Sequence, residues 1–470
     1  MVMLVILVMG GAVFLINSLS SSALHAKRQA QTEFALAQAK EALIGFSLKV
    51  LISKSDVACA VTSNCPRPGD LPCPDTDNDG AAESSCGNAS GTTGQTSRLG
   101  RLPWKTLGLP DLRDGSGERL WYAVSNNFKN NTRATCNNSV HTGCLNSDTL
   151  GTINVFASNG SVEHNGSDAS GAAAVIFSPG NVLQRQGALL PQNRACTIGV
   201  DCDATEKCTS TPPTSSPKCD PTNYLDKVAA EDNADFIDGS STNGFIQGEI
   251  KIFDPIANTS NTILNDQLLV ISKDNIILPV QKRVAAEVRN CLTEYASNPK
   301  NNNFLPWAAG NRIIVGGQAT YPDSSNVEFG RIPDQPFTQT CNDTGGNTCG
   351  TTGGMSDSWG ATCTINNTNW WTNWKEVIFY GLAHSLRPHD LTHNHSCPGS
   401  TCLTVNPPSA ANDKSFVIIV SGEKLGAQTR SNDAEKNVPS NYLEGTNLNG
   451  TSPFEQNTTS PTFNDVAIFN

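Results

Sequence analysis

The chain has 470 residues, of which 37% are hydrophobic and 16% are charged. This length is enough for roughly three folding units, or for fewer large ones. The 39 glycines and 26 prolines are too few to indicate a disordered chain. The net charge of -11 opposes contact with a phosphate backbone, so no nucleic acid is expected as the main ligand.

The 16 cysteines are an even and high count, and none lies in the C-x-x-C motif that is typical of zinc or redox sites. Structural disulfides persist in oxidising compartments, so most of the protein is expected outside the cytoplasm. Spacing alone does not fix the connectivity. Neighbouring cysteines favour the pairs Cys59–Cys65, Cys136–Cys144, Cys196–Cys202, Cys208–Cys219, Cys341–Cys349 and Cys397–Cys402, which leaves Cys73, Cys86, Cys291 and Cys363 to pair among themselves.

The chain begins with an apolar run. Residues Met1 to Ile16 are apolar apart from two glycines, and the first charged residue is Lys27. About 20 helical residues span a bilayer, so residues 1–25 are predicted to form a transmembrane half-helix. A cleaved secretory signal is the alternative, but the run lacks a basic n-region and an A-x-A cleavage site.

A second helical stretch follows directly. Residues Ala26 to Leu51 are rich in Ala, Leu, Gln, Glu and Lys, which are strong helix formers. Residues 26–53 are therefore predicted to be an amphipathic continuation of the same helix, with an apolar stripe that packs on a globular head. That stripe is expected to contain Phe34, Ala37, Leu43 and Ile44.

An apolar half-helix that runs into an amphipathic one ending AQAKEALIGFSL resembles the first helix of type IV pilins and type II secretion pseudopilins. The resemblance implies that the apolar half holds the subunit in the inner membrane and later lies in a filament core, packed against other pilin-like subunits. The head would face outward. The family carries a basic leader, so either such a leader lies upstream of Met1 or processing differs.

The head shows signs of an internal repeat. A predicted helix at Ala35–Val50 is followed by short segments that recur in the same order after a second predicted helix at Val280–Tyr295. The first set is Leu71–Pro74, Gly100–Trp104, Leu120–Ser125, Ala174–Ser178, Asp235–Gly239 and Asn265–Val270. The second set is Leu305–Trp307, Gly330–Pro333, Ile378–Ala383, Phe416–Val420, Asn441–Gly445 and Asn464–Ile468.

These segments predict an α+β fold with a disulfide-rich head made of two tandem pilin-like modules. Each module would place a helix on an antiparallel sheet of short β-branched strands joined by Asn-Gly and Pro-Gly turns. The first module is expected over residues 54–276 and the second over residues 277–470. Chance alignment of turn-rich segments is the alternative.

One loop has the composition of a calcium site. Asp75, Asp77 and Asp79 alternate before Gly80, and Glu83 stands at the ninth position. Ca²⁺ prefers hard oxygen ligands at such spacing, so Asp75, Asp77, Asp79 and Glu83 are predicted as metal ligands. Cys86 occupies the place of the bidentate glutamate of an EF-hand, which excludes that motif. The alternative is a solvated turn held by cysteines.

Other clusters offer weaker chemistry. His384, His389, His393 and His395 could bind Zn²⁺ or Cu²⁺, but without a regular metal motif an exposed histidine-rich loop is favoured. Two S-x-x-K matches, at Ser421–Lys424 and Ser215–Lys218, lack the other motifs of acyl-transfer enzymes. No catalytic residue is assigned, and the protein is not expected to be an enzyme.

Six tryptophans form another group. They could form a binding platform for a sugar or a partner, because aromatic side chains dominate interface hot spots. Core packing is favoured because several adjoin predicted strands. The residues are Trp104, Trp121, Trp307, Trp370, Trp371 and Trp374.

These features together favour a non-enzymatic pseudopilin or minor pilin. It would be a single-pass inner-membrane protein that joins or decorates a type IV pilus or type II secretion filament. Its head, in the periplasm or on the cell surface, would serve adhesion or binding of an unknown partner. The alternative is a membrane-anchored extracytoplasmic binding protein outside any filament.

Overall fold

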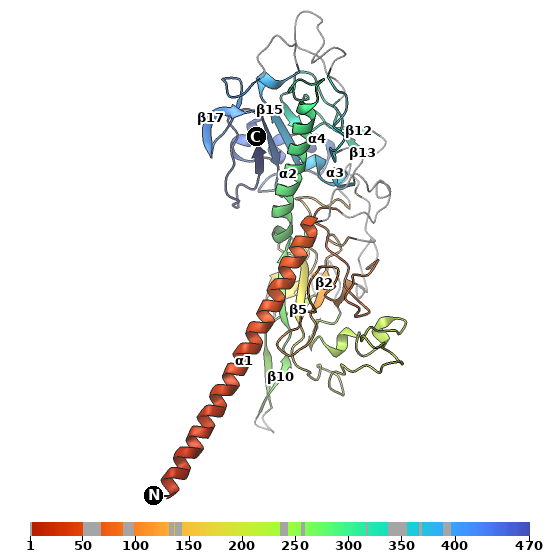
Figure 1. Ribbon diagram of the computed structural model, residues 1–470, viewed down its shortest axis with the longest axis vertical. Helices are drawn as coiled ribbons and strands as arrows, with labels where there is room; N and C mark the ends of the chain where they lie inside the picture. Colours follow the sequence, from red (N-terminus) through yellow and green to blue (C-terminus); the bar gives the residue numbers. More distant parts are fainter. Residues whose placement is uncertain are drawn as a thin grey trace, which may run out of the picture. The chain divides into compact units, whose positions relative to one another are not determined.

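The computed structural model describes residues 2–49, 67–87, 98–130, 136, 143–235, 243–254, 259–315, 318–336, 355–365, 369–388 and 396–470. The chain divides into two compact units (Figure 1). Unit 1 contains Met1–Phe46, Leu71–Lys129 and Leu150–Lys273. Unit 2 contains Ser47–Asp70, Asn130–Thr149 and Asp274–Asn470.

The N-terminal helix α1 extends over Val2–Lys49, and its side chains are described from Ser22 onward. Its buried residues recur every three or four positions, as expected for one helix face. Phe34, predicted to lie on that face, is 64% exposed, so this part of the prediction is wrong. Ala37, also predicted for that face, is exposed, whereas Leu43 is buried as predicted. The other buried residues are Thr32, Ala35, Leu36, Ala39 and Ser47.

Close backbone contact selects this face of α1. The Gly115 N–H donates to Thr32 Oγ1 at 2.9 Å. A Cβ atom at position 115 would lie only 2.2 Å from the Arg28 carbonyl oxygen, so glycine is needed for the approach. Thr32 therefore faces unit 1, while Phe34, two residues further, points away.

No helix among the residues that the structure describes combines the length and the apolar character needed to cross a membrane. This finding contradicts the predicted transmembrane half-helix over residues 1–25 and the predicted single-pass location in the inner membrane. The side chains of residues 1–21 lie outside the description.

Unit 1 is built on a four-stranded antiparallel sheet of order β1-β2-β5-β11. Its strands are β1 (Leu99–Arg101), β2 (Trp121–Val124), β5 (Ala172–Ser178) and β11 (Gln267–Ser272). All seven residues of β5 are buried, which suits the central position of that strand. Around the sheet lie β3 (Val155–Phe156), β4 (Val162–His164), β6 (Lys227–Val228), β7 (Glu231–Asp232), β8 (Phe245–Ile246), β9 (Ile250–Asp254), β10 (Thr259–Leu264), η3 (Pro213–Ser215) and η4 (Pro221–Asn223).

Unit 2 has a four-stranded antiparallel sheet of order β14-β15-β18-β19. Its strands are β14 (Phe329–Arg331), β15 (Ile378–Leu382), β18 (Phe416–Val420) and β19 (Val466–Phe469). Helix α2 (Lys273–Ser297) begins at the boundary between the units. The other elements are β12 (Ile313–Val315), β13 (Gln318–Thr320), α3 (Asn369–Trp374), η5 (Lys375–Val377), η6 (His384–Leu386), β16 (Leu403–Val405), β17 (Ser409–Lys414), α4 (Asp433–Lys436), η7 (Pro439–Asn441) and η8 (Gly445–Asn449).

The predicted architecture, a membrane-spanning helix followed by two tandem helix-plus-sheet modules, is wrong. The described chain has one N-terminal helix, and the rest is an α+β mixture. Five of its seven described sheets contain only two or three strands. The apolar segments are short and separated by turn residues, so most of them cannot extend into larger sheets.

What recurs is the register of the two four-stranded sheets. Gly100 pairs with Tyr122 in unit 1, and Gly330 pairs with Tyr380 in unit 2. Each tyrosine hydroxyl donates to a proline carbonyl, at 3.1 Å to Pro72 O and at 3.2 Å to Pro306 O. The aligned segments that supply these residues thus form strands in the same order in both units.

Six disulfides lie among the described residues. Four join the predicted neighbours: Cys136–Cys144, Cys196–Cys202, Cys208–Cys219 and Cys397–Cys402. The remaining described cysteines form Cys73–Cys86 and Cys291–Cys363. These predictions are confirmed, and the predicted pairs Cys59–Cys65 and Cys341–Cys349 lie outside the described residues.

Candidate metal centre and binding groove

The acidic loop of unit 1 brings three of its four predicted ligands together. Ligand oxygens of Asp75, Asp77 and Glu83 lie within 4.8 Å of one another. Thr76 Oγ1 donates to Glu83 Oε1 at 2.7 Å, which holds the glutamate against the start of the loop. The Asp79 carboxylate is not part of this group.

Backbone hydrogen bonds shape the loop around Asp75. The Gly80 N–H donates to Asp75 Oδ2 at 2.7 Å, and the Asp79 N–H donates to Asp75 Oδ1 at 3.2 Å. Burial raises the pKa of Asp75 to about 7, and the charges of Asp77 and Asp79 act in the same direction. An extra cation beside Asp75 would favour its ionised form.

Gly80 is required by both conformation and space. Its φ angle is +88°, and a Cβ atom there would lie 2.6 Å from the Trp104 indole. We expect Gly80→Ala to lower the unfolding free energy by about 2 kcal/mol, through backbone strain and displacement of Trp104. Gly108→Ala is the matched control, because Gly108 has a φ of +70° and nothing within 4 Å of the added Cβ. Equal losses in urea unfolding for both variants would contradict a role for the Trp104 contact.

Two lysines partly neutralise the loop. Lys207 Nζ lies 2.8 Å from Asp77 Oδ2 and 2.8 Å from Asp79 Oδ2. Lys105 Nζ donates to the Asp79 carbonyl oxygen. Partial burial acts to raise the pKa of Asp79, but the hydrogen bond and charge of Lys207 outweigh it and lower that pKa.

The charge balance suits a divalent cation. Once all four carboxyl groups are ionised, the two ammonium groups leave two negative charges in the loop. The donors are carboxylate oxygens, which are the hard ligands that Ca²⁺ takes. Asp75, Asp77 and Glu83 are thus the residues that could hold a divalent cation here, and Lys207 contacts both Asp77 and Asp79.

Sequence reasoning missed Lys207, which lies 128 residues from Asp79 in the chain. The Cys208 N–H donates to the Asp77 carbonyl oxygen at 2.7 Å. This hydrogen bond holds the neighbouring Lys207 next to the loop. No local pattern near Asp75–Glu83 points to this lysine.

The histidine cluster is described only in part. His384 Nδ1 lies 2.6 Å from Glu328 Oε1 at the surface of unit 2. His389, His393 and His395 lie outside the described residues, so the structure does not bring them together or separate them.

The tryptophans pack in the interior, with one exception. Trp104 is half-buried, and its indole packs against Gly80 of the acidic loop. The predicted core packing is confirmed for the others, which are buried: Trp121, Trp307, Trp370, Trp371 and Trp374.

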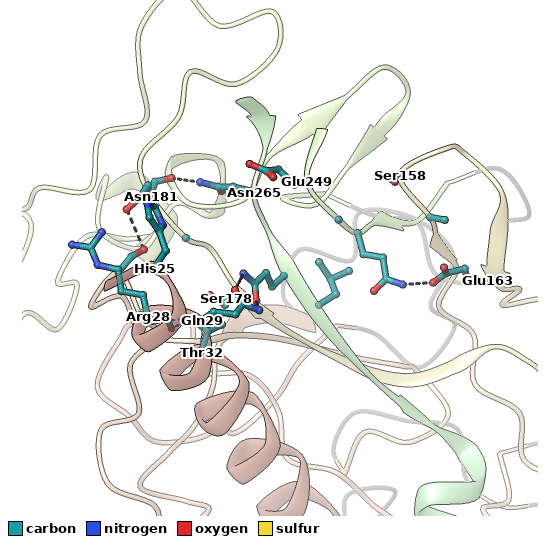
Figure 2. A pocket seen from close by; sticks show the side chains of 18 residues that line it. His25, Arg28, Gln29, Thr32, Ser158, Glu163, Ser178, Asn181, Glu249 and Asn265 are labelled. Atoms are coloured by element: carbon teal, nitrogen blue, oxygen red, sulfur yellow. Dashed lines mark hydrogen bonds between the residues drawn. The ribbon is translucent and has the colours of Figure 1, made fainter. Parts of the chain in front are cut away.

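Unit 1 also contains an open polar groove of about 780 Å³ (Figure 2). One wall is α1, which contributes His25, Arg28 and Gln29. Gln29 and Gln267, from β11, both line the groove, and their side chains are joined by two hydrogen bonds of 3.2 and 2.9 Å. Sequence reasoning missed this groove, because its walls come from segments far apart in the chain.

The charges of the groove are divided between its walls. His25 and Arg28 lie on the helix side, while Glu163, in β4, and Glu249, just before β9, lie on the other side (Figure 2). Between them, amide and hydroxyl side chains alternate with small and apolar residues, and the described lining contains no Phe, Tyr or Trp. Such a surface suits a polar polypeptide segment with charges of both signs better than a stacked sugar ring.

Comparisons of the chain with protein-family models, with curated proteins and with solved structures find no match.

Proposed function

We propose that the protein is a non-enzymatic, pilin-like subunit that joins or decorates a type IV pilus or type II secretion filament. Helix α1 would contact neighbouring subunits, and the head would bind a partner. The proposal rests on the resemblance of the N-terminal segment to pilins and on the exposure of α1.

The exposure of α1 is the observation that carries the proposal. Every residue from Ser22 to Gln31 is exposed, and Leu24 keeps 49% of its surface open. Phe34 is 64% exposed on the side away from unit 1. Apolar side chains on an open helix face favour packing against another protein.

The disulfides support an extracytoplasmic head. Six pairs of described cysteines are joined as disulfides, and such bonds persist where the compartment is oxidising. A head outside the cytoplasm would meet millimolar calcium in many settings, which suits a loop with few ligands.

Filament assembly is tested by shearing filaments from cells and measuring the chain by mass spectrometry. We expect Leu24→Glu together with Phe34→Glu to reduce the filament-bound amount at least about tenfold, because each buries a charge in the contact. The melting temperature of the head should stay unchanged. Leu448→Glu is the matched control, since Leu448 is a 41% exposed leucine in unit 2. Wild-type protein that is absent from filaments but present elsewhere would contradict the proposal.

The polar groove favours a second candidate, an extracytoplasmic binding protein outside any filament. A groove with charges of both signs can select a polypeptide without help from neighbouring subunits. Glu163→Gln with Glu249→Gln should then abolish partner capture while leaving filaments unaffected. Capture that needs intact filaments would instead favour the first candidate.

We propose Ca²⁺ as the ligand of the acidic loop. Chelation should lower the melting temperature, because bound calcium stabilises the folded state by about 2.7 kcal/mol at a hundred times its dissociation constant. Asp77→Ala with Asp79→Ala should remove this sensitivity, and Lys207→Met should increase it because a competing cation is lost. Asp168→Ala is the control, since its carboxylate is exposed elsewhere in unit 1. Equal melting of the wild type with and without calcium would contradict the assignment.

A further inference from the structure

Each unit contains a pair of buried carboxyl groups, one of which immediately precedes the last strand of the four-stranded sheet. In unit 1 the pair is Asp226 and Asp266, and both side chains are fully buried. In unit 2 the pair is Glu444 and Asp465, which are 7% and 3% exposed. Neither pair belongs to the acidic loop or to the groove.

The unit 1 pair is held by reciprocal backbone hydrogen bonds. The Asp226 N–H donates to Asp266 Oδ2 at 2.8 Å, and the Asn265 N–H donates to Asp226 Oδ2 at 2.8 Å. Asn233 Nδ2 adds a second donor to Asp266 Oδ2, at 2.8 Å. Gln192 Nε2 donates to Asp226 Oδ1 at 3.1 Å.

The unit 2 pair repeats these contacts group for group. The Glu444 N–H donates to Asp465 Oδ2 at 3.1 Å, and the Asn464 N–H donates to Glu444 Oε2 at 3.1 Å. Asn447 Nδ2 donates to Asp465 Oδ2 at 3.0 Å. Gln428 Nε2 donates to Glu444 Oε1 at 2.8 Å.

One oxygen of each pair has no donor. Asp266 Oδ1 and Asp465 Oδ1 are both buried, and no described residue hydrogen-bonds to either. An ionised carboxylate oxygen without a donor is costly in the interior. The same oxygen bearing a proton is neutral, and it can donate to the other carboxyl group of the pair.

The cations beside the unit 1 pair are shared with other carboxylates, which leaves little positive charge to balance two ionised aspartates. In unit 1 the facing cations are Arg194 and Arg185. They also contact Glu118 and Asp232, respectively. Lys227, next to Asp226 in the chain, lies 3.8 Å from Asp232 Oδ2, and the Tyr224 ring lies 4.8 Å from the Arg194 guanidinium.

In unit 2 an arginine beside the pair is likewise shared with another carboxylate. Arg430 covers the Tyr442 ring at 4.2 Å and is paired with Asp148 at 2.8 Å. Glu455, the next carboxylate, accepts the Thr446 N–H at 2.6 Å and contacts Asn447 through its backbone.

We propose that each carboxyl pair holds one shared proton at neutral pH and acts as an acid-stabilised clasp on the last strand. In unit 1 the proton lies between Asp226, in the segment Asn-Tyr-Leu-Asp, and Asp266, which precedes β11. In unit 2 it lies between Glu444, in the segment Asn-Tyr-Leu-Glu, and Asp465, which precedes β19. Protonation adds one hydrogen bond and removes one buried charge. Loss of this proton puts two like charges side by side and loosens the strand.

The pKa shifts agree in direction. Burial raises the pKa of Asp266 well above its ordinary range, and the charge of Asp226 adds to the effect. Burial raises the pKa of Asp226 to about 6. In unit 2 burial raises the pKa of Asp465, and the neighbouring Glu444 carboxyl acts in the same direction.

The sign of the pH effect follows from these directions. The folded protein binds the proton more tightly than the unfolded chain, whose aspartates have a pKa of 3.8. The contribution of the clasp to stability is complete below that value. It is lost as the pH rises through about 6 for Asp226 and through the higher pKa of Asp266.

The test uses the full chain with Asp266→Asn and Asp465→Asn, in which an amide replaces the protonated acid. The wild type should lose on the order of 5 °C in melting temperature between pH 5 and pH 9 from the two clasps. The double variant should match the wild type at pH 5 and melt above it at pH 9. Asp168→Asn, at an exposed site, should keep the wild-type profile.

Infrared spectroscopy of the wild type gives a second readout that does not depend on folding of a variant. The protonated carboxyl band at pH 7 should exceed that of a single group, because Asp75, whose pKa is about 7, also keeps part of its proton there, and it should weaken as the pH rises. Absence of that band at pH 7 would overturn the proposal. A double variant whose melting temperature falls equally at every pH would overturn it as well.

Discussion

Replacement of Cys291 and Cys363 by serine will lower the unfolding free energy of unit 2 by about 4.4 kcal/mol, as the loop-closure entropy of the disulfide predicts. The two residues are 72 positions apart, so their bond restricts a long loop of the unfolded chain. Both are also 2% exposed, so their replacement disturbs packing in the C-terminal third of α2. Calorimetry of this variant, with its other disulfides intact, should show one unfolding transition at a markedly lower temperature than in the wild type.

The disulfide Cys397–Cys402 is the matched control. Its cysteines are five positions apart, and the same relation gives about 2 kcal/mol for so short a loop. The Cys397→Ser, Cys402→Ser variant should therefore lose less than half as much stability. Equal losses for the two variants would show that loop length does not govern the effect.

Trp121→Ala will lower the unfolding free energy of unit 1 by about 3–5 kcal/mol, the usual cost of removing a buried large aromatic side chain. Trp121 is 1% exposed and belongs to the main core cluster of unit 1. Its ring lies 5.3 Å from that of Tyr224, and the Arg101 guanidinium lies 4.3 Å from it. The variant therefore opens a cavity and removes one of the two rings that cover Arg101. Urea unfolding followed by hydrogen exchange of β2 and β5 would measure the loss.

The second unit supplies the control for this prediction. Phe379 lies opposite Arg331 in the sheet, as Trp121 lies opposite Arg101, and the Arg331 guanidinium lies 3.5 Å from the Phe379 ring. Trp121→Phe keeps a ring against the arginine and removes an indole N–H that no described residue accepts. Its cost should be well under half that of Trp121→Ala. A phenylalanine variant as unstable as the alanine variant would contradict the packing argument.

The sequence predicted the strands and the disulfides well because both leave local signals. Ala174–Ser178 and Phe416–Val420 are short apolar runs bounded by turn residues, and both are central strands. The confirmed neighbour disulfides join cysteines that are 5 to 11 residues apart. Such spacing leaves few alternative partners.

Properties that depend on distant contacts were not predictable in the same way. The face of α1 was assigned from hydrophobicity, and Phe34 was placed inside. The backbone approach of Gly115 to Arg28 decides the face instead. Lys207 reaches the acidic loop through the packing of a disulfide-bonded segment, so the loop sequence could not reveal it.

The repeat alignment erred at one segment. Asn441–Gly445 was aligned with Asp235–Gly239, of which only Asp235 lies among the described residues. The contacts show that Asn441–Glu444 corresponds to Asn223–Asp226, since both supply the acidic residue of a carboxyl pair. Both units contain the sequence Asn-Tyr-Leu at this place and the sequence Gln-x-Arg upstream of it. These shared residues indicate the correct match from the sequence alone.

The division of the chain into units has a consequence for biosynthesis. Unit 2 takes in residues 47–70 and 130–149, although its main part begins at Asp274. Asp148 pairs with Arg430, a residue 282 positions later. At about 5–20 residues per second, the ribosome needs on the order of tens of seconds to deliver that arginine. During this time the early segments remain without their packing partners. A fragment that starts at Asp274 would never receive them, and Arg430 would be left as a buried cation without its carboxylate.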